Sequence, residues 1–81
     1  MLTTPSRRYF SIYTGPRLAA QSLTESHVRA IGGEPAMRGT CHVYAWIYAS
    51  DASDVVIRLQ DAAPSHGYRA LDVVERGRAG V

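Results

Sequence analysis

Cysteine and histidine are the side chains of this sequence best suited to nucleophilic or metal chemistry. The 81 residues include one cysteine, Cys41, and three histidines, His27, His42 and His66. A thiol nucleophile needs a histidine base beside it, but Cys41 and His42 are neighbours on an expected strand, where adjacent side chains point to opposite faces. We therefore interpret Cys41 as a small buried thiol. The histidines lack the spacing of a helical or cysteine-paired metal motif, so we expect no metal site.

The acidic side chains have structural explanations that need no catalysis. Asp51, Asp54 and Asp61 fall at the start and along the exposed side of an expected helix, where capping and the helix dipole favour negative charge. Asp72 and Glu75 fall on opposite faces of an expected strand, which separates them as an acid and base pair. The sequence has no lysine for Schiff-base chemistry and no glycine-rich phosphate-binding motif. We expect neither an enzyme nor a bound cofactor.

Length and composition favour one small globular domain in the cytoplasm. The chain is 46% hydrophobic and 20% charged, with a net charge of +2, so we treat residues 1–81 as a single domain with an ordered core over about 7–78. The weak charge argues against a nucleic-acid binder driven by electrostatics. One cysteine suits a reducing compartment, and the segment Met1–Pro5 lacks the pattern of a secretory signal. No run of about 18 apolar residues occurs, so we expect no membrane partner.

Hydropathy periodicity and turn residues predict strand, helix, strand, helix and strand. The expected elements are a strand over Arg7–Thr14, a helix over Leu23–Ile31, a strand over Thr40–Ala49, a helix from Ser50–Asp54 to about Ala63 and a strand over Tyr68–Arg76, with room for a short strand at Pro35–Gly39. This order suits a two-layer α+β domain with one or two helices on one face of a mostly antiparallel sheet of three to four strands. A ferredoxin-like arrangement, with the first and third strands central, is the leading topology.

Two of these elements depend on local signals. The run Ser22–Glu25 has capping-box spacing, and Gly32–Gly33 can end a helix, which favours a helix here over a short strand at His27–Ile31 in a meander. In the last strand, alternation places Leu71 and Val73 on one face and Tyr68, Ala70, Asp72 and Val74 on the other.

The segment Thr40–Ala49 alternates most clearly. One face carries Cys41, Val43, Ala45, Ile47 and Ala49, and the other carries His42, Tyr44, Trp46 and Tyr48. Small aliphatic side chains are typical of a face beneath helices, so we expect the aromatic side chains to stay open and to be joined by Tyr9 and Tyr13. Such a cluster exceeds the about 300–600 Å² of the largest apolar patch on an ordinary monomer, so we expect it to be covered.

Three covers are compatible with the sequence. Residues 18–36 or the N-terminal residues would make the rings part of the core. A second copy of the chain or another protein would make them an interface, because tyrosine, tryptophan and arginine are enriched at binding hot spots. A single-stranded nucleic acid would stack its bases on the rings.

The run Arg38–Ala45 resembles the RNP1 octamer of RNA-recognition motif domains at Arg38, Gly39 and Val43. It departs from that octamer where Thr40 and His42 replace base-stacking aromatics, Cys41 replaces a small residue and Ala45 replaces a closing aromatic. The resemblance covers about a tenth of the chain and implies a sheet face that binds single-stranded RNA or DNA.

Arginines gather near the ends of the first and last expected strands. If these strands are antiparallel neighbours, Arg7, Arg8, Arg76 and Arg78 meet at one corner and can grip phosphate or a carboxylate cluster. The alternative is that they are simply solvated.

The layout from Arg7 to Arg78 is similar to that of small phage or mobile-element inhibitors, the anti-CRISPR proteins among them. This resemblance implies a non-enzymatic inhibitor of a Cas protein or surveillance complex in the host bacterial cytoplasm, as a monomer or a homodimer. The alternative is the single-strand nucleic-acid module. In both hypotheses the binding residues are Tyr9, Tyr13, His42, Tyr44, Trp46 and Tyr48, with Arg7, Arg8, Arg76 and Arg78 at the rim.

Overall fold

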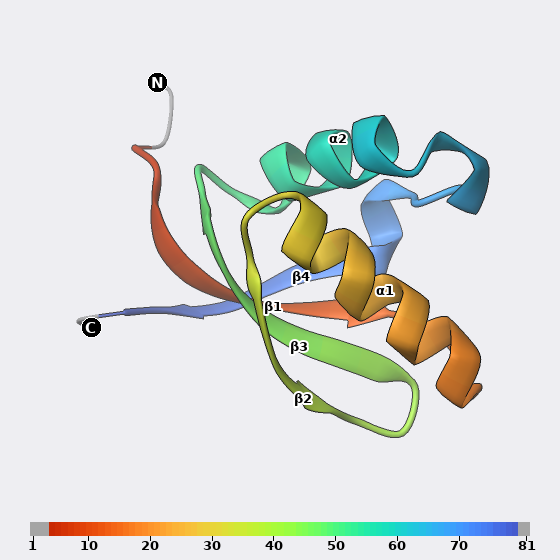
Figure 1. The fold of residues 1–81 in the computed structure, drawn as a ribbon. Coiled ribbons are helices and arrows are strands. Elements are labelled where there is room, and N and C mark those ends of the chain that lie inside the picture. Colours follow the sequence, from red (N-terminus) through yellow and green to blue (C-terminus); the bar gives the residue numbers. More distant parts are fainter. Residues whose placement is uncertain (1–3, 80–81) are drawn as a thin grey trace.

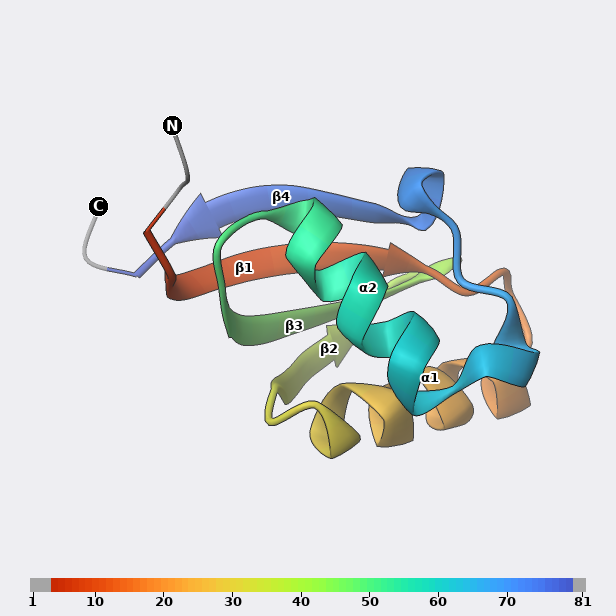
Figure 2. The ribbon, with the colours of Figure 1, turned by 90° about the horizontal axis from the view of Figure 1, so that it is seen from above.

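A computed structural model describes residues 4–79 of the chain. It contains β1 (Ser6–Tyr13), α1 (Leu18–Ala30), β2 (Glu34–Arg38), β3 (His42–Ala49), α2 (Ala52–Ala62) and β4 (Val73–Arg78), with 3-10 turns at Pro64–His66 and Ala70–Asp72. The strands form an antiparallel sheet in the order β2-β3-β1-β4. Both helices lie on the same side of this sheet (Figures 1 and 2). The expected two-layer α+β fold is confirmed, and its ferredoxin-like order places β1 and β3 in the centre.

The turn into α2 follows the predicted capping chemistry. The Asp51 side chain accepts a hydrogen bond from the Asp54 amide at 2.9 Å, and the Asp54 carboxylate accepts one from the Ser50 amide at 2.9 Å. These reciprocal bonds satisfy backbone donors that have no partner within the helix. The helix therefore starts close to its predicted position, and its inward stripe of Val55, Val56 and Leu59 is buried.

Helix α1 begins five residues before the predicted start. Arg17, the N-cap residue, separates the Gly15–Pro16 turn from Leu18, and the Leu-Ala-Ala run that opens the helix has high intrinsic helix propensity. The expected capping box is wrong, because Ser22 and Glu25 lie within the helix and bind Arg38 of β2. The alternative strand at His27–Ile31 is also wrong. Gly32 ends the helix with a φ of 84°, as the glycine pair predicted.

Strand β4 begins at Val73, five residues after the predicted start at Tyr68. A 3-10 turn precedes it, in which the Asp72 side chain accepts a hydrogen bond from the Arg69 amide at 2.8 Å. This turn interrupts the expected alternation, so Leu71 is exposed although Val73 is buried. Tyr68 instead enters the core.

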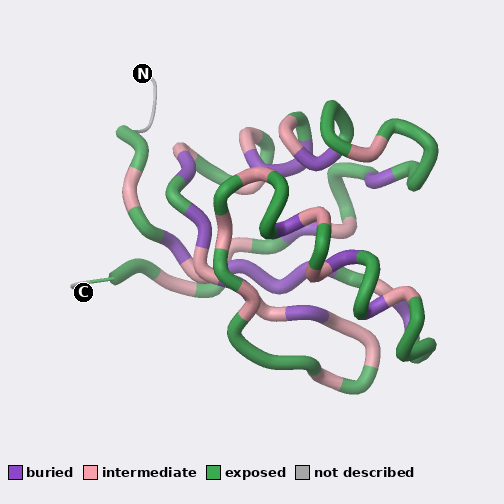
Figure 3. The backbone as a smooth tube through the Cα atoms, in the orientation of Figure 1, coloured by how far each residue is buried: buried purple, intermediate pink, exposed green. Residues whose placement is uncertain are grey.

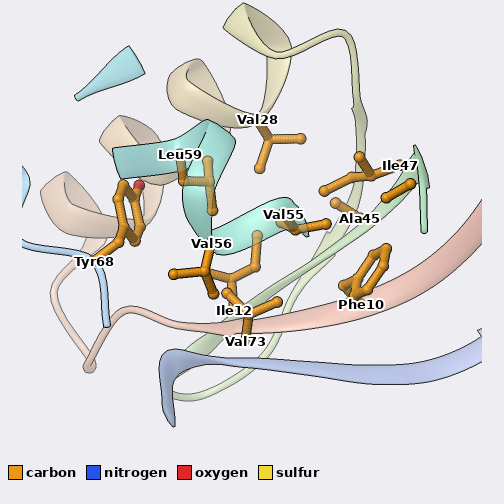
Figure 4. Close-up of a cluster of buried hydrophobic side chains, with 11 residues drawn as sticks. Phe10, Ile12, Val28, Ala45, Ile47, Val55, Val56, Leu59, Tyr68 and Val73 are labelled. Atoms are coloured by element: carbon orange, nitrogen blue, oxygen red, sulfur yellow. The ribbon is translucent and has the colours of Figure 1, made fainter. Parts of the chain in front are cut away.

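The core lies between the helices and one face of the sheet. Its cluster comprises Phe10, Ile12, Val28, Ala45, Ile47, Ala49, Val55, Val56, Leu59, Tyr68 and Val73 (Figure 4). Burying each of the larger aliphatic or aromatic side chains stabilises the fold by about 1.5–3 kcal/mol relative to exposure. The aliphatic side chains of β3 from Val43 to Ala49 therefore face the helices, as predicted. By contrast, β2 is exposed along most of its length (Figure 3).

Candidate interaction face

The sheet has a face that neither helix touches, which we call the open face. Strand alternation and the pairing register of the sheet assign side chains to it. They are Arg7, Tyr9, Ser11 and Tyr13 of β1; His42, Tyr44, Trp46 and Tyr48 of β3; Glu34 and Met37 of β2; and Val74 and Arg76 of β4. All six predicted aromatic residues therefore lie on one surface.

Five of the six rings of the open face, all except Tyr48, form a continuous series across β1 and β3. The Tyr9 ring centroid lies 4.8 Å from that of Trp46 and 6.0 Å from that of Tyr44. His42 continues the series, at 6.2 Å from Tyr44 and 5.5 Å from Tyr13. These separations fall in the range in which aromatic pairs attract one another. The rings are therefore preorganised by mutual contact.

The open face retains considerable exposed apolar surface. Tyr48 is 66% exposed, Met37 55%, Tyr13 48% and Val74 43%. The prediction that residues 18–36 fold over the rings is wrong, because they form α1 on the other side of the sheet and most of the edge strand β2. Residues 1–3, part of the other proposed internal cover, lie outside the described residues. Within residues 4–79, the rings are shielded mainly by one another and by Arg7.

Arg7 forms the main charged contact of the open face. Its guanidinium carbon lies 4.5 Å from the Trp46 ring centroid, and the same group lies 3.5 Å from the Glu34 carboxylate of β2. Arginine prefers such positions because its planar charge is weakly hydrated and attracted by the ring face. Arg7, Trp46 and Glu34 thus link the three strands at this end of the sheet.

The predicted arginine corner does not form as one cluster. Strands β1 and β4 are antiparallel neighbours, but alternation sends Arg7 and Arg8 to opposite faces. Arg8 is buried on the helix side and donates to the Ala49 carbonyl at 2.9 Å. Arg8 and Arg78 both approach Glu75, at 3.3 Å and 3.7 Å.

Arg76 is the second cation of the open face. It sits in a bulge of β4 and donates from Nε to the Ser11 hydroxyl at 3.0 Å. Of the four predicted arginines, Arg7 and Arg76 lie on the open face, whereas Arg8 and Arg78 contact Glu75.

The segment that resembles RNP1 is only partly on the sheet. Thr40, at one base-stacking position of RNP1, lies in the turn before β3, whereas His42, at the other, is the first residue of β3. Arg38 points toward α1 and binds the Glu25 carboxylate at 2.8 Å and 3.0 Å. These hydrogen bonds hold the pKa of Glu25 below its ordinary value. The aromatic residues that do occupy the central strands are Tyr9, Tyr44 and Trp46.

Cys41 is half-buried rather than fully buried. The expected position on the aliphatic face is wrong because the strand begins one residue later, at His42. The Cys41 carbonyl accepts hydrogen bonds from the amides of Thr14, at 2.8 Å, and Gly15, at 3.1 Å. These bonds fix the turn.

A second cluster of polar rings, which the sequence did not predict, lies on the helix side. The His27 ring nitrogen Nδ1 is 2.7 Å from the Tyr68 hydroxyl, and the His66 ring is 5.2 Å from that of His27. Burial, followed by repulsion from His66, lowers the pKa of His27, and burial raises the pKa of Tyr68. No sequence motif predicts this cluster, because the contact between His27 and Tyr68 depends on how α1 packs against the turn after α2.

This cluster borders a shallow groove between α1 and the end of α2. Leu23, Ala62, Ala63 and Pro64 supply most of its apolar lining. Within residues 4–79, no three histidine, cysteine or acidic side chains are grouped as metal ligands. The same part of the chain contains no helix that is long and apolar enough to cross a bilayer.

Comparisons with known proteins give no family for the chain. The sequence matches no protein-family model, and neither curated proteins nor solved structures give a significant match.

Proposed function

We propose that this chain is a non-enzymatic binding protein that docks another protein on its open face. The observation that carries this proposal is the continuous series of rings, centred on Tyr9, Tyr44 and Trp46, on a sheet face without helices. Such rings bury a large area with few rotatable bonds, which is why tyrosine and tryptophan dominate binding hot spots. Their mutual contacts also reduce the entropy lost on binding.

The charges of the open face favour a protein partner over nucleic acid. This face carries two arginines and one glutamate, and Arg7 already has Glu34 as an ionic partner. A nucleic-acid complex gains much of its affinity by neutralising several phosphates. Few free cations around a large aromatic surface instead resemble the composition of protein interfaces.

A finer form of the proposal is that binding inhibits a bacterial defence complex. The resemblance in layout to anti-CRISPR proteins supports it, with a Cas subunit or effector complex as the target in the host bacterial cytoplasm. An inhibitor of this kind needs a rigid surface and no reaction chemistry. The small ferredoxin-like domain and its open face provide such a surface.

Binding of single-stranded RNA or DNA is the second candidate. One observation favours it: the central strands β1 and β3 carry Tyr9, Tyr44 and Trp46 on their open side. RNA-recognition motif domains also stack bases on aromatic side chains of a four-stranded sheet. In this case Arg7 and Arg76 would contact phosphates.

Affinity capture with matched variants tests the proposal. The tagged chain is incubated with bacterial lysate, with and without nuclease, beside the double variant Tyr44→Ala/Trp46→Ala. The control is Leu18→Ala/Ile57→Ala, which removes two exposed apolar side chains from the helix layer. We expect the wild type and the control to retain the same protein after nuclease treatment, and the aromatic variant to lose it.

The captured protein is then purified and its affinity measured at about 0.05 M and about 0.5 M salt. A protein interface formed by apolar rings should change little between these conditions. Loss of capture after nuclease, with steep weakening in salt, would support the nucleic-acid candidate instead. Equal capture by the aromatic variant would remove the open face from either role.

A further inference from the structure

The pairing register arranges the open face in rows that run across the sheet. In one row, Glu34 of β2 lies beside Trp46 of β3, Trp46 beside Tyr9 of β1, and Tyr9 beside Gly77 of β4. Arg76 occupies the bulge next to Gly77. This row therefore has an acid at the β2 edge, a base at the β4 edge and two large rings between them.

In the next row, the two central side chains differ in size. Met37, Tyr44, Ser11 and Val74 follow one another from β2 to β4. Exposed aliphatic side chains stand at both edges, and a large ring lies beside a small hydroxyl in the centre. Reversing the row end for end would place the apolar edges on each other and Tyr44 over the position of Ser11, which is itself buried and whose hydroxyl accepts a hydrogen bond from Arg76.

We propose that the open face pairs with the open face of a second copy of this chain, about a twofold axis parallel to the strands. The inference rests on the proposed use of this face for docking a protein, and it names one occupant. A twofold axis makes a self-complementary interface, in which each contact occurs twice. Aligned packing of two sheets is also a common way to bury their inner faces.

Charge favours this axis over a twofold axis that runs across the strands. An axis across the strands would set each edge on itself, so that the β4 edge with Arg76 would meet its own copy. An axis along the strands sets β2 on β4, so that Glu34 meets Arg76 of the second copy. Glu34 then lies between that guanidinium and its own Arg7, 3.5 Å away. Opposite charges at both edges favour this orientation.

The same axis accounts for the exposed side chains of the face. Tyr48 is paired with Arg7 within the chain, so its ring faces the aliphatic stem of Arg7 of the second copy, whose guanidinium lies over Trp46. Met37 and Val74, which are 55% and 43% exposed, cover each other across the axis. Trp46 meets Tyr9 twice at the centre, where interface hot spots concentrate.

A stable dimer requires most of the open face. A standard interface buries about 800 Å² on each partner. The whole surface of the domain is 4961 Å², so such an interface takes about a sixth of it. The sheet forms one of the two broad sides of a two-layer molecule (Figure 2). A different protein that docks on the open face would compete with the second copy.

Charge exchange tests the proposed orientation. Sedimentation equilibrium is measured from about 1 to about 200 μM, a range that covers ordinary dimer affinities. We expect Glu34→Arg and Arg76→Glu each to weaken the dimer about tenfold, because the axis makes each substitution act at two contacts. Mixing the two variants should restore association, since both cross-axis contacts of the mixed dimer then join opposite charges. The double variant should restore it in the same way.

A covalent test does not depend on the stability of those variants. Strands β2 and β4 are separated by two strands, about 14 Å apart, so cysteines at positions 37 and 74 cannot bond within one chain. Facing positions of two stacked sheets lie about 10 Å apart, too far for a disulfide. In a Cys41→Ser background, we therefore expect Met37→Cys/Val74→Cys to give a covalent dimer with a short bismaleimide cross-linker, in which each thiolate adds to one maleimide without a change of oxidation state. The single variants Met37→Cys and Val74→Cys should cross-link much less, because neither position faces itself.

A monomer over the whole concentration range would overturn the inference, and so would a dimer that Trp46→Ala leaves intact. A dimer with no cross-link between positions 37 and 74 would equally exclude this orientation. Heterologous capture separates these results from the function proposed above. A monomer whose captured partner is lost with Tyr44→Ala/Trp46→Ala leaves the proposed function standing. A confirmed dimer whose aromatic variant still captures that partner would refute heterologous docking through this face.

Discussion

On the helix side of the sheet, Val43, Ala45 and Ile47 of β3 are inaccessible to solvent, whereas the side chains that alternate with them on the open side remain partly exposed. Both faces belong to the same strands and share one backbone. The two faces differ in their side chains. Compact aliphatic groups let α1 and α2 approach the sheet closely, whereas the large rings bury part of their area against one another without a helix.

The arginines of β1 show the same difference at adjacent positions. Arg8 faces the helix side, where a carbonyl and Glu75 satisfy its guanidinium. Arg7 faces the open side, where it lies over Trp46 and is 47% exposed along its side chain. Arg8 is thus buried beside the core, and Arg7 remains accessible to a partner.

The largest expected difference between the faces is in stability. Ile47→Ala should lower the free energy of unfolding by about 2–4 kcal/mol, because it leaves a cavity beneath the helices. Tyr48→Ala, the next residue on the open side, should change it by no more than about 0.5 kcal/mol. Urea unfolding followed by far-ultraviolet circular dichroism measures both. Comparable losses in the two variants would contradict the assignment of the faces.

A second expected difference concerns the two adjacent arginines. Arg8→Ala should cost about 2 kcal/mol, because it leaves the Ala49 carbonyl and Glu75 without their buried donor. Arg7→Ala should cost less than about 1 kcal/mol, since its ion pair and ring contact are exposed. The same urea measurement compares them. If Arg7→Ala were the more damaging change, the open face would be holding the monomer together.

Glycine positions offer a third contrast. A Cβ at Gly33 would lie 2.8 Å from Val28 Cγ1 and 2.9 Å from Ile47 Cγ1, whereas a Cβ at Gly77 would meet no atom within 4 Å. Gly33→Ala should therefore destabilise the fold by about 1–3 kcal/mol through overpacking. Gly77→Ala should be neutral or stabilise it by up to about 1 kcal/mol. Thermal unfolding of both variants checks this, and a neutral Gly33→Ala would show that α1 is less tightly packed on β3.

Much of the fold could be predicted because local patterns carried it. Alternation in β3 identified which of its faces the helices cover, and the N-cap candidates in the run Ser50–Asp54 marked the start of α2, where Asp51 is the N-cap. The start of α1 was mispredicted because Ser22 and Glu25 have capping-box spacing but bind Arg38, a residue distant in the sequence. The start of β4 was mispredicted because residues 68–72 alternate in the sequence as a strand would, although residues 70–72 form a 3-10 turn.

The candidate site was predictable to the extent that it depends on strand alternation. Tyr44 and Trp46 were placed correctly, and Tyr9 joined them because β1 and β3 are neighbours. The arginine corner failed because an antiparallel register and a bulge in β4 decide which side each arginine faces. The contact between His27 and Tyr68 could not be predicted, since it forms only after α1 packs on the turn preceding β4.

The smallest expected effect is a pH dependence confined to the helix side. Burial and repulsion from His66 lower the pKa of His27 in the folded protein from its ordinary value of 6.5. The unfolded chain therefore binds a proton more readily than the folded one, so stability is constant above this value and falls as the pH drops below it. Unfolding in urea at about pH 7.5 and about pH 5.5 measures the loss, above the range in which carboxylates titrate.

His27→Gln should reduce this loss, and His66→Ala should reduce it less, because burial is the larger cause of the shift. His42→Gln, on the open face, should leave the contribution of His27 in place. A loss that persists unchanged in His27→Gln would place the pH-sensitive group elsewhere, and one abolished by His42→Gln would move it to the open face.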